Sequence, residues 1–249
     1  MSSTPSPRPF PGPVLVLAAM PEESAPLHAR LDAATTLEVP FTGGVSAVRG
    51  SLHGIDTVVV TTGIGIAAAT AAATWGILAT SPALVLAAGS CGGLAADVEV
   101  GTLIVGESFT YSIADATAFG YVPGQVPGGP ERFEAVPAWV DAAERAALRA
   151  DADGDGRGVR RGLMLSGDAF VTADIAAPMR ERFRAALSAD METTASARTA
   201  EALGVPFVAL RAVSDLCGPA AGQQFHLELD VVAEISARAV EELARDLAA

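Results

Sequence analysis

Short apolar runs alternate along the chain with longer stretches in which apolar residues recur every three or four positions. The runs are continuous rather than broken by polar residues, which is typical of strands covered on both faces of a sheet. They predict strands at residues 14–19, 57–61, 83–88, 103–105, 163–165 and 207–213. The stretches between them predict helices at residues 22–31, 66–78, 137–149, 173–187 and 191–203. A final helix has apolar residues at every fourth position, namely Val231, Ile235, Ala239, Leu243 and Leu247.

Strands that alternate with helices indicate an α/β fold. We expect a three-layer sandwich with a central, twisted, mostly parallel mixed sheet between helical layers. Residues 1–13 are rich in Ser, and six of them are Pro or Gly, which suit neither a helix interior nor a central strand. The pattern therefore predicts a flexible tail over residues 1–13 and a single domain over residues 14–249.

Composition narrows the choice of partners. The chain has 249 residues, of which 50% are hydrophobic and 18% charged, so it can bury a sizeable core. Its formal net charge is -13, and all basic residues other than His are Arg. An acidic surface repels nucleic-acid phosphates and anionic lipid heads, so we expect neither a nucleic-acid nor a membrane partner.

The chain has no charged residue between Asp56 and Asp97, which could suggest a membrane helix. Several Gly residues and a Pro interrupt this stretch, however, so a buried strand–helix–strand unit explains it better. The apolar run at residues 14–19 is too short for a signal peptide. Two cysteines, Cys91 and Cys217, are too few for a disulfide framework, and we expect free thiols in the cytoplasm. The three histidines make no metal-ligand spacing with the cysteines, so no metal is expected.

The residues that follow the predicted strands are the first place to look for chemistry, because ligands of such sheets bind beyond the carboxyl ends of the strands. These segments are Glu22 with Glu23, residues 63–65, residues 89–93, and Ser214 with Asp215. The two Gly-rich segments let the backbone approach a ligand, although each is also compatible with a simple tight turn. Neither is a dinucleotide fingerprint or a P-loop, and the context of Ser90 is not that of a hydrolase nucleophile.

Three carboxylates stand at or near the carboxyl ends of the predicted strands. Glu23 and Asp215 directly follow apolar strands, and Glu192 lies at another predicted junction. Glycosidic cleavage uses one carboxylic acid to protonate the leaving group and one carboxylate to activate water. Each residue also has a purely structural reading: Glu23 as a helix N-terminal acid, Asp215 as a turn cap and Glu192 as a first-turn acid.

Taken together, these segments resemble the 5′-methylthioadenosine/S-adenosylhomocysteine nucleosidases, a family within the nucleoside phosphorylase superfamily. The similarity extends from about residue 14 to the C-terminus. The segments that carry it are AAMPEE (18–23), TGIGIAAA (62–69), AAGSCGGLA (87–95), ADATAFGYVPGQVPG (114–128), RGLMLSGDAFV (161–171), ADMETTA (189–195) and VPFVALRAVSD (205–215).

This resemblance implies an N-glycosyl hydrolase that releases adenine from a small 5′-substituted nucleoside, with no metal or organic cofactor. Asp215 matches the general acid that acts on adenine N7, and Glu23 matches the residue that activates water. Glu192 matches the carboxylate that holds the ribose hydroxyls, with Met191 beneath the sugar. The other matching positions are Phe170 and Val171 around the purine, Ser90 and Ile64 on the ribose and water side, and Ser214 and Arg211 as supports.

The resemblance also implies a homodimer, because Ala116, Phe119 and Tyr121 match a loop that reaches into the neighbouring subunit's site. The chain departs from the family pattern at four places. Pro21 and Glu22 precede Glu23 where many members have a run of Glu, and Ile66 replaces a Lys. Residues 216–222 form a longer connection, and Leu229 stands where an aromatic residue often covers the 5′ substituent. These departures concern the 5′ pocket, so a futalosine-type nucleoside hydrolase is an alternative.

Two further alternatives are a purine nucleoside phosphorylase and a non-catalytic nucleoside-binding protein. A phosphorylase needs cations for phosphate. Ala87 stands where those relatives carry an Arg, and the first loop offers carboxylates, which would repel the nucleophile. A binding protein would need neither a water-activating Glu nor an acid, and this chain has Glu23 and Asp215.

Overall fold

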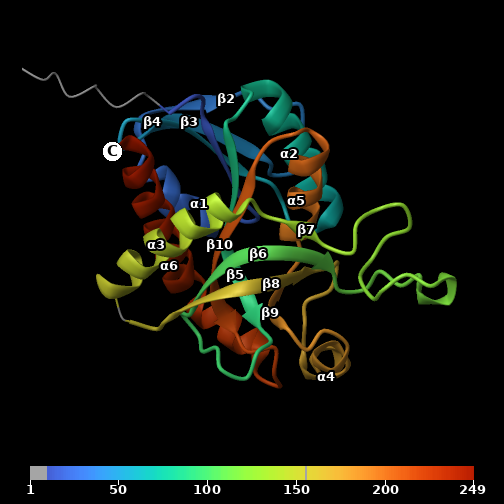
Figure 1. Ribbon diagram of the computed structural model, residues 1–249. Helices are drawn as coiled ribbons and strands as arrows, with labels where there is room; N and C mark the ends of the chain where they lie inside the picture. Colours follow the sequence, from blue (N-terminus) through green and yellow to red (C-terminus); the bar gives the residue numbers. More distant parts are fainter. Residues whose placement is uncertain (1–9, 155) are drawn as a thin grey trace, which may run out of the picture.

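The computed structural model describes residues 10–154 and 156–249, whose apolar runs form one mixed sheet that helices cover (Figure 1). The strands of these ranges are β1 (Val14–Ala18), β2 (Asp32–Leu37), β3 (Ser46–Leu52), β4 (Ile55–Thr61), β5 (Leu84–Gly93), β6 (Leu103–Tyr111), β7 (Phe133–Glu134), β8 (Val159–Ser166), β9 (Ala186–Asp190) and β10 (Phe207–Asp215). The helices are α1 (Pro21–His28), α2 (Ile66–Thr80), α3 (Pro137–Ala152), α4 (Ala173–Arg182), α5 (Thr193–Ala202) and α6 (Ala221–Ala248), and a 3₁₀ turn covers Thr117–Phe119.

The sheet runs in the order β10-β6-β8-β9-β5-β1-β4-β3-β2, with β7 beside β6. β5 pairs in parallel with both β1 and β10, and β10 also pairs antiparallel with β6. β9 returns to pair with the end of β5 at Gly92 and Gly93. Strands β5, β10, β6, β8 and β9 therefore close into a ring, while β1, β4, β3 and β2 extend from it as an open sheet. This closure brings the ends of β5, β9 and β10 together.

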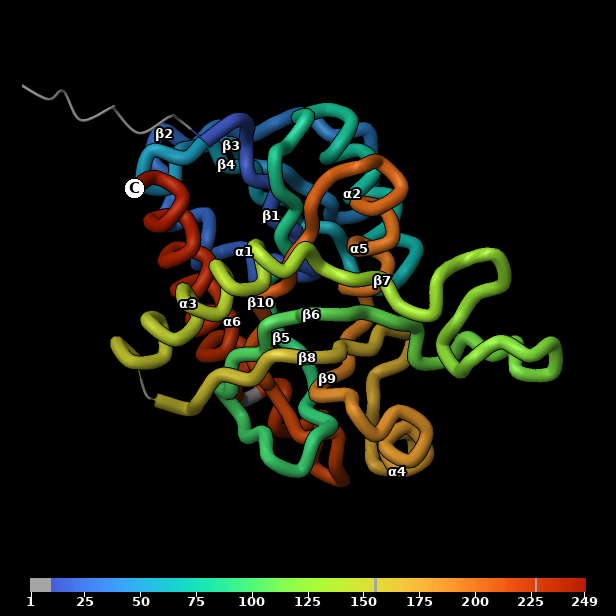
Figure 2. Tube along the Cα trace, in the orientation of Figure 1, coloured from blue at the N-terminus to red at the C-terminus, as the bar shows by residue number. Residues whose placement is uncertain are grey.

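Helices lie on two sides of the sheet (Figures 1 and 2). α6 packs against β5 and β10 and contacts both α1 and α3, while α2 and α5 pack against each other on the other side. α6 has a buried stripe at Val232, Ile235, Ala239 and Leu243, the spacing of one face of a helix. The segment between β6 and β7 extends away from the body of the molecule in both views.

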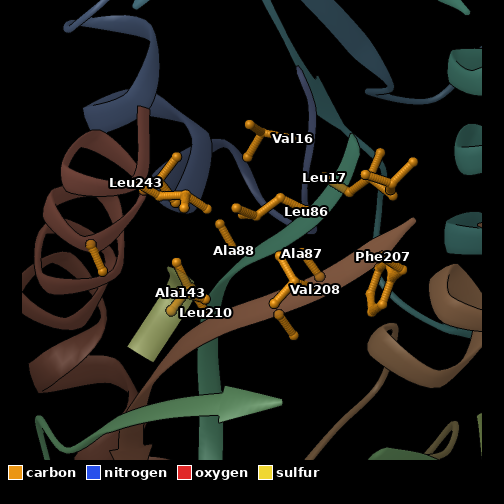
Figure 3. Packing of buried hydrophobic residues seen from close by; sticks show 14 of the residues in the cluster. Val16, Leu17, Leu86, Ala87, Ala88, Ala143, Phe207, Val208, Leu210 and Leu243 are labelled. Atoms are coloured by element: carbon orange, nitrogen blue, oxygen red, sulfur yellow. The ribbon is translucent and has the colours of Figure 1, made fainter. Parts of the chain in front are cut away.

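The core lies between the central strands and these helices. Figure 3 shows Val16 of β1, Leu86 of β5 and Leu210 of β10 meeting Leu243 of α6. All four side chains are at most 1% exposed. Burial of this apolar surface provides the main stabilisation and makes β1, β5 and β10 a rigid base for the residues that follow them.

The α/β class and all six predicted strands are confirmed. The helix predicted at residues 173–187 is wrong at its C-terminal end, because α4 ends at Arg182 and residues 186–190 form β9. β2 was not predicted, since only half of its residues are apolar and it is an exposed edge strand. Residues 1–9 of the predicted tail lie outside the described residues, whereas the ring of Phe10 packs edge-on against Trp139.

None of the helices in the described ranges combines the length and the apolar character needed to cross a bilayer. Cys91 and Cys217 are both buried and both free, as the cysteine count predicts.

Candidate active site

A cavity of about 260 Å³ opens where β1, β5, β9 and β10 end. Its walls join residues from the whole length of the chain, and most of the side chains that the sequence singled out are among them. The lining residues are Ala19, Met20, Glu23, Ile64, Ser90, Cys91, Gly92, Ala169, Phe170, Val171, Ala189, Asp190, Met191, Glu192, Arg211, Ser214, Asp215, Cys217 and Phe225.

Glu23 is held by four hydrogen bonds in the first turn of α1. Its Oε2 accepts the backbone N–H groups of Ala19 at 2.8 Å and Met20 at 3.2 Å. Its Oε1 accepts both the N–H and the hydroxyl of Ser90, each at 2.7 Å. These donors suit a carboxylate, which is an acceptor only. Gly89 makes the arrangement possible: a Cβ at this position would lie 2.5 Å from the carboxyl carbon of Glu23.

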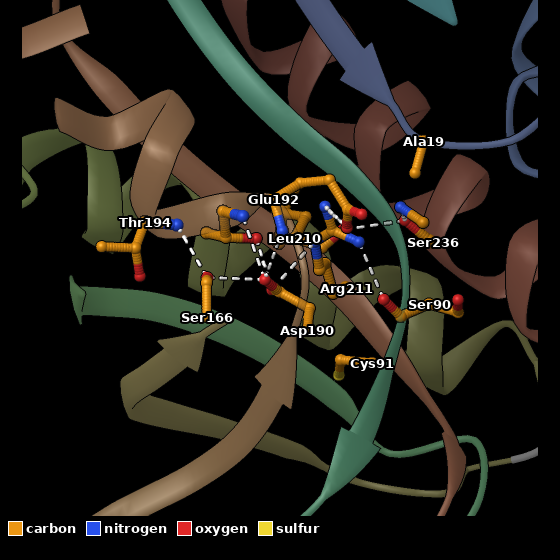
Figure 4. A network of polar contacts seen from close by, with 12 residues as sticks. Ala19, Ser90, Cys91, Ser166, Asp190, Glu192, Thr194, Leu210, Arg211 and Ser236 are labelled. Atoms are coloured by element: carbon orange, nitrogen blue, oxygen red, sulfur yellow. Dashed lines mark hydrogen bonds and ion pairs between the residues drawn. The ribbon is translucent and has the colours of Figure 1, made fainter. Parts of the chain in front are cut away.

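Arg211 links the strand ends beneath the cavity (Figure 4). Its side chain is 2% exposed, and its Nη1 donates to the carbonyl oxygen of Ser90 at 2.8 Å. It forms ion pairs with Asp190, where Nε and Oδ2 are 3.4 Å apart, and with Glu192, where Nη2 and Oε2 are 3.5 Å apart. Asp190 Oδ1 also accepts the Ser166 hydroxyl at 2.6 Å, and thus fixes the junction between β9 and α5.

Glu192 is a buried carboxyl group with a raised pKa. Its Oε1 accepts the N–H of Gly65 at 2.9 Å, and its residue is 6% exposed. Burial is the largest cause of a pKa of about 7, while Arg211 opposes the shift and the charges of Asp190 and Glu23 add to it. A group that gains or loses its proton near neutral pH therefore faces the cavity.

Asp215 ends β10 and is 2% exposed. Its Oδ1 accepts the N–H of Cys217 at 3.0 Å, and its Oδ2 accepts the hydroxyl of Ser214 at 3.0 Å. Burial raises the pKa of Asp215 above its usual value, although these hydrogen bonds partly offset the effect. A buried carboxyl group with a raised pKa is suited to donate a proton.

The opposite wall of the cavity is largely apolar. Phe170 and Phe225 meet edge to face, with ring centroids 5.7 Å apart, and Met20, Ile64 and Val171 complete this wall. Phe170 is 42% exposed and Ile64 56% exposed, so both have apolar surface free for a ligand. The cavity lining thus combines apolar and aromatic side chains with buried carboxyl groups.

Asp168 connects two loops at the cavity mouth. Its Oδ1 accepts the N–H of Ile66 at 2.7 Å, at the N-terminus of α2. Asp168 lies two residues before Phe170, so this bond joins the loop after β4 to the loop that carries the aromatic wall. A carboxylate at a helix N-terminus also interacts favourably with the helix dipole.

The structure brings together most of the predicted site residues. In the cavity wall lie Glu23, Ile64, Ser90, Phe170, Val171, Met191, Glu192, Arg211, Ser214 and Asp215. Ala116, Phe119, Tyr121 and Leu229 are not among the lining residues. Phe119 is 82% exposed on the projecting segment between β6 and β7.

Sequence reasoning missed five contributors: Asp190, Asp168, Cys91, Cys217 and Phe225. Asp190 and Asp168 lie inside the matched segments ADMETTA and RGLMLSGDAFV, and their polar character at strand ends was a usable signal. Phe225 had no such signal, because it depends on where α6 begins. Among the described residues, no group of three or more His, Cys, Asp or Glu side chains is arranged to hold a metal ion.

The chain is similar to known proteins over nearly its whole length. Residues 13–249 match the model of the phosphorylase superfamily. A 5′-methylthioadenosine/S-adenosylhomocysteine nucleosidase from Neisseria meningitidis, solved with methylthio-immucillin-A, is 34% identical with a TM-score of 0.88, over 94% of this chain and 99% of that one. The corresponding nucleosidase from Colwellia psychrerythraea, solved with adenine, is 30% identical with a TM-score of 0.88, over 96% and 98%.

An S-adenosylhomocysteine nucleosidase from Streptococcus pyogenes, solved with 5-methylthiotubericidin, is 25% identical with a TM-score of 0.87, over 98% of this chain and 99% of that one. This chain therefore covers nearly the full length of all three structures.

Proposed function

Because the chain belongs to the phosphorylase superfamily and, within it, to the 5′-methylthioadenosine/S-adenosylhomocysteine nucleosidases, we propose that it hydrolyses the N-glycosidic bond of 5′-substituted adenine nucleosides. The observation that carries this proposal is the set of three buried carboxyl groups, Glu23, Glu192 and Asp215, around one cavity with an aromatic wall. Methylthioadenosine, S-adenosylhomocysteine and 5′-deoxyadenosine are the proposed substrates.

Asp215 is the proposed general acid. Adenine is a poor leaving group as an anion, and a proton on N7 lets it depart as a neutral base. The raised pKa of Asp215 supports this role, because the carboxyl group must carry a proton when the bond breaks. Ser214 orients it through the hydrogen bond to Oδ2.

Glu23 is the proposed base for water, and Glu192 the proposed partner of the ribose hydroxyls. As the bond to the base breaks, the sugar takes on the character of an oxocarbenium ion, which nearby negative charge stabilises. Water adds its oxygen to C1′ and gives up a proton to Glu23. Ser90 and Arg211 support this role, since they fix Glu23 and the β5 backbone beside it.

The remaining wall would bind the rest of the nucleoside. Phe170 is proposed to stack on the purine, with the backbone of Val171 along its edge, and Met191 is proposed to lie beneath the sugar. Ile64 would contact the ribose side. The exposure of Phe170 and Ile64 supports these roles, because both have apolar surface to bury on binding.

Hydrolysis rather than phosphorolysis is supported by the charges around the cavity. Arg211 is the one basic side chain among the described lining residues, and Ser90, Asp190 and Glu192 already engage it. Phosphate would have to approach three carboxyl groups without a free cation, which is electrostatically unfavourable.

We further propose a cytoplasmic homodimer in which Ala116, Phe119 and Tyr121 of one subunit contact the site of the other. The projecting segment that carries them supports this arrangement, since Phe119 is 82% exposed and Ile113 60% exposed. Leu229 is proposed to contact the 5′ substituent from α6, next to the wall formed by Phe225.

The test is release of free adenine from methylthioadenosine by the purified protein, measured with and without added phosphate. Release that does not depend on phosphate supports the proposal, and the 5′ substituents can then be compared. Release only with phosphate would establish a phosphorylase and refute the electrostatic argument. No release in either condition would refute both and favour a futalosine-type substrate or a binding protein.

A further inference from the structure

Ser236 brings a buried hydroxyl group to the side of α6 that packs on the sheet. Its residue is 1% exposed, and the neighbouring Val232 and Ile235 belong to the apolar core. A buried hydroxyl has lost its contact with water, so it needs hydrogen-bond partners within the protein. Ser236 has two such partners, and they belong to two different strands (Figure 4).

The hydroxyl of Ser236 bridges β5 and β10. Its Oγ accepts the N–H of Gly89 at 2.9 Å and donates to the carbonyl oxygen of Leu210 at 2.8 Å. Gly89 is the partner of Arg211 in the register of these two parallel strands, and it directly precedes Ser90. One side chain of α6 therefore fixes both strands where their first cavity-lining residues begin.

Gly89 is the point at which this bridge comes close to Glu23. Its φ of 120° lies in the region that favours glycine. A Cβ at Gly89 would lie 2.5 Å from the carboxyl carbon of Glu23, so the backbone of β5 passes directly against the carboxyl group. The position of Gly89 therefore sets the distance between β5 and Glu23.

Ser90 connects Gly89 to the carboxylate by hydrogen bonds. Its N–H and its hydroxyl each donate to Glu23 Oε1 at 2.7 Å. This N–H belongs to the planar peptide unit that joins Gly89 to Ser90, so its direction follows the backbone of Gly89. The other oxygen, Oε2, is held separately by the N–H of Ala19 at 2.8 Å. A rotation of the backbone at Gly89 would thus displace the donors of one oxygen only, and would turn the carboxylate.

The position of α6 is fixed in addition against α1, the helix that carries Glu23. Arg30, just after α1, forms ion pairs with Glu234 and Glu241 of α6, and its Nε lies 2.8 Å from Glu241 Oε2. Glu234 lies two residues before Ser236. α6 is therefore connected to both supports of Glu23, to the helix by these ion pairs and to β5 by the hydroxyl of Ser236.

We propose that Ser236 is a positioning residue whose hydroxyl, acting through Gly89 and Ser90, holds the carboxylate of Glu23 in the orientation that activates water. The proposal rests on the proposed function, since it concerns the base of that reaction. Ser236 is not among the residues that line the cavity, so it acts on Glu23 and not on the nucleoside. Its loss should therefore change kcat more than KM.

The experiment measures kcat and KM for adenine release in Ser236→Ala. This variant leaves the N–H of Gly89 and the carbonyl oxygen of Leu210 without their shared partner. We expect kcat to fall roughly five- to ten-fold, the effect of one lost hydrogen bond on a reacting group, while KM stays nearly unchanged. An unchanged kcat would overturn the proposal, as would a rise of KM that accounts for the whole loss of kcat/KM.

A double-mutant cycle with Ser90→Ala separates positioning from a general effect on packing. If Ser236 acts through Ser90, the two substitutions remove parts of one connection, and the double variant should be faster than the product of the two single losses predicts. A double variant whose loss of kcat equals that product would overturn the proposal, because it would show that the two residues act independently.

Ser196→Ala is the matched control. Ser196 is also a helical Ser that is 1% exposed, and its hydroxyl has no hydrogen-bond partner among the described residues. Its substitution should leave kcat unchanged. Ser236→Cys keeps most of the bulk of the side chain with a weaker hydrogen-bonding group, and it should show the same loss of kcat to a smaller extent. This variant decides the question if Ser236→Ala does not fold.

A second readout does not need turnover. The backbone N–H groups of Ser90 and Ala19 donate to opposite oxygens of Glu23, so their amide resonances report on its carboxylate from both sides. Both resonances should move in Ser236→Ala and stay in place in Ser196→Ala. A shift confined to Ser90 would overturn the proposal, because the change would not reach Glu23. If the wild type released no adenine, the proposed function would fail alone, and these resonances would still decide whether Ser236 holds Glu23.

Discussion

Replacing Glu192 with Gln should remove a specific part of the pH dependence of stability. The folded protein raises the pKa of Glu192 from 4.5 to about 7, chiefly because the carboxyl group is buried. Gln has nearly the same shape as the protonated acid but does not titrate. It keeps an oxygen for the N–H of Gly65, and Arg211 keeps its ion pair with Asp190.

The sign and size follow from linkage. A pKa that is higher in the folded state means that protonated Glu192 stabilises the fold fully below about pH 4.5 and that this stabilisation is lost as the pH rises through about 7. Raising a pKa by one corresponds to about 1.4 kcal/mol, so the wild type should lose roughly 3 kcal/mol of unfolding free energy across this window. Glu192→Gln should lack this loss, because its amide stays neutral.

The assay is urea-induced unfolding of both proteins without ligand, at pH values from about 5 to about 8. The difference in unfolding free energy between Glu192→Gln and the wild type should increase in favour of the variant as the pH rises to about 7 and level off above it. Contributions of titratable groups that do not interact with Glu192 cancel in this difference when the two folds are the same. A difference that stays constant with pH would refute the reasoning, since it would show that Glu192 titrates alike in the folded and unfolded states.

Three further substitutions test the site. Asp215→Asn should lower kcat by about 10²–10⁴-fold and still bind adenine in a calorimetric titration, because it removes the acid and keeps the shape; unchanged kcat would exclude Asp215 as the acid. Glu23→Gln should also lose kcat, because the amide cannot accept the proton of water, and a variant as fast as the wild type would disprove that role. Asp168→Asn weakens the bond to the Ile66 N–H, so KM should rise roughly five-fold with little change in kcat; an unchanged KM would show that this contact does not position Phe170.

Much of the fold could be predicted because the central strands are continuous apolar runs. Residues 14–18 and 207–213 are buried throughout. A continuous apolar run of this kind is typical of a strand that is covered on both faces of the sheet. Strand β9 could not be predicted in this way. Its sequence Ala-Leu-Ser-Ala-Asp is short and only partly apolar, and it becomes a strand because β8 and the end of β5 pair with it. Tertiary contacts override local preference there.

The site residues show the same difference between features of the local sequence and features of the tertiary packing. Glu23 and Asp215 were visible because they stand directly after apolar strands. Phe225 was not, because its position in the cavity depends on α6 beginning at Ala221, ten residues before the repeating apolar pattern starts. The close packing of Cys217 and Asp215 depends on the absence of a side chain at Gly92. Such details depend on three-dimensional packing and leave no periodic trace in the sequence.

The double pairing of β10 has a consequence for how activity is lost. This strand carries Arg211, Ser214 and Asp215, and it is hydrogen-bonded to β5 on one edge and to β6 on the other. Amide groups of such a strand exchange with solvent mainly when the whole domain opens. Arg211, Ser214 and Asp215 therefore belong to the last part of the molecule to open. Under heat or denaturant, Asp215 should therefore keep its place in the sheet until the domain as a whole unfolds.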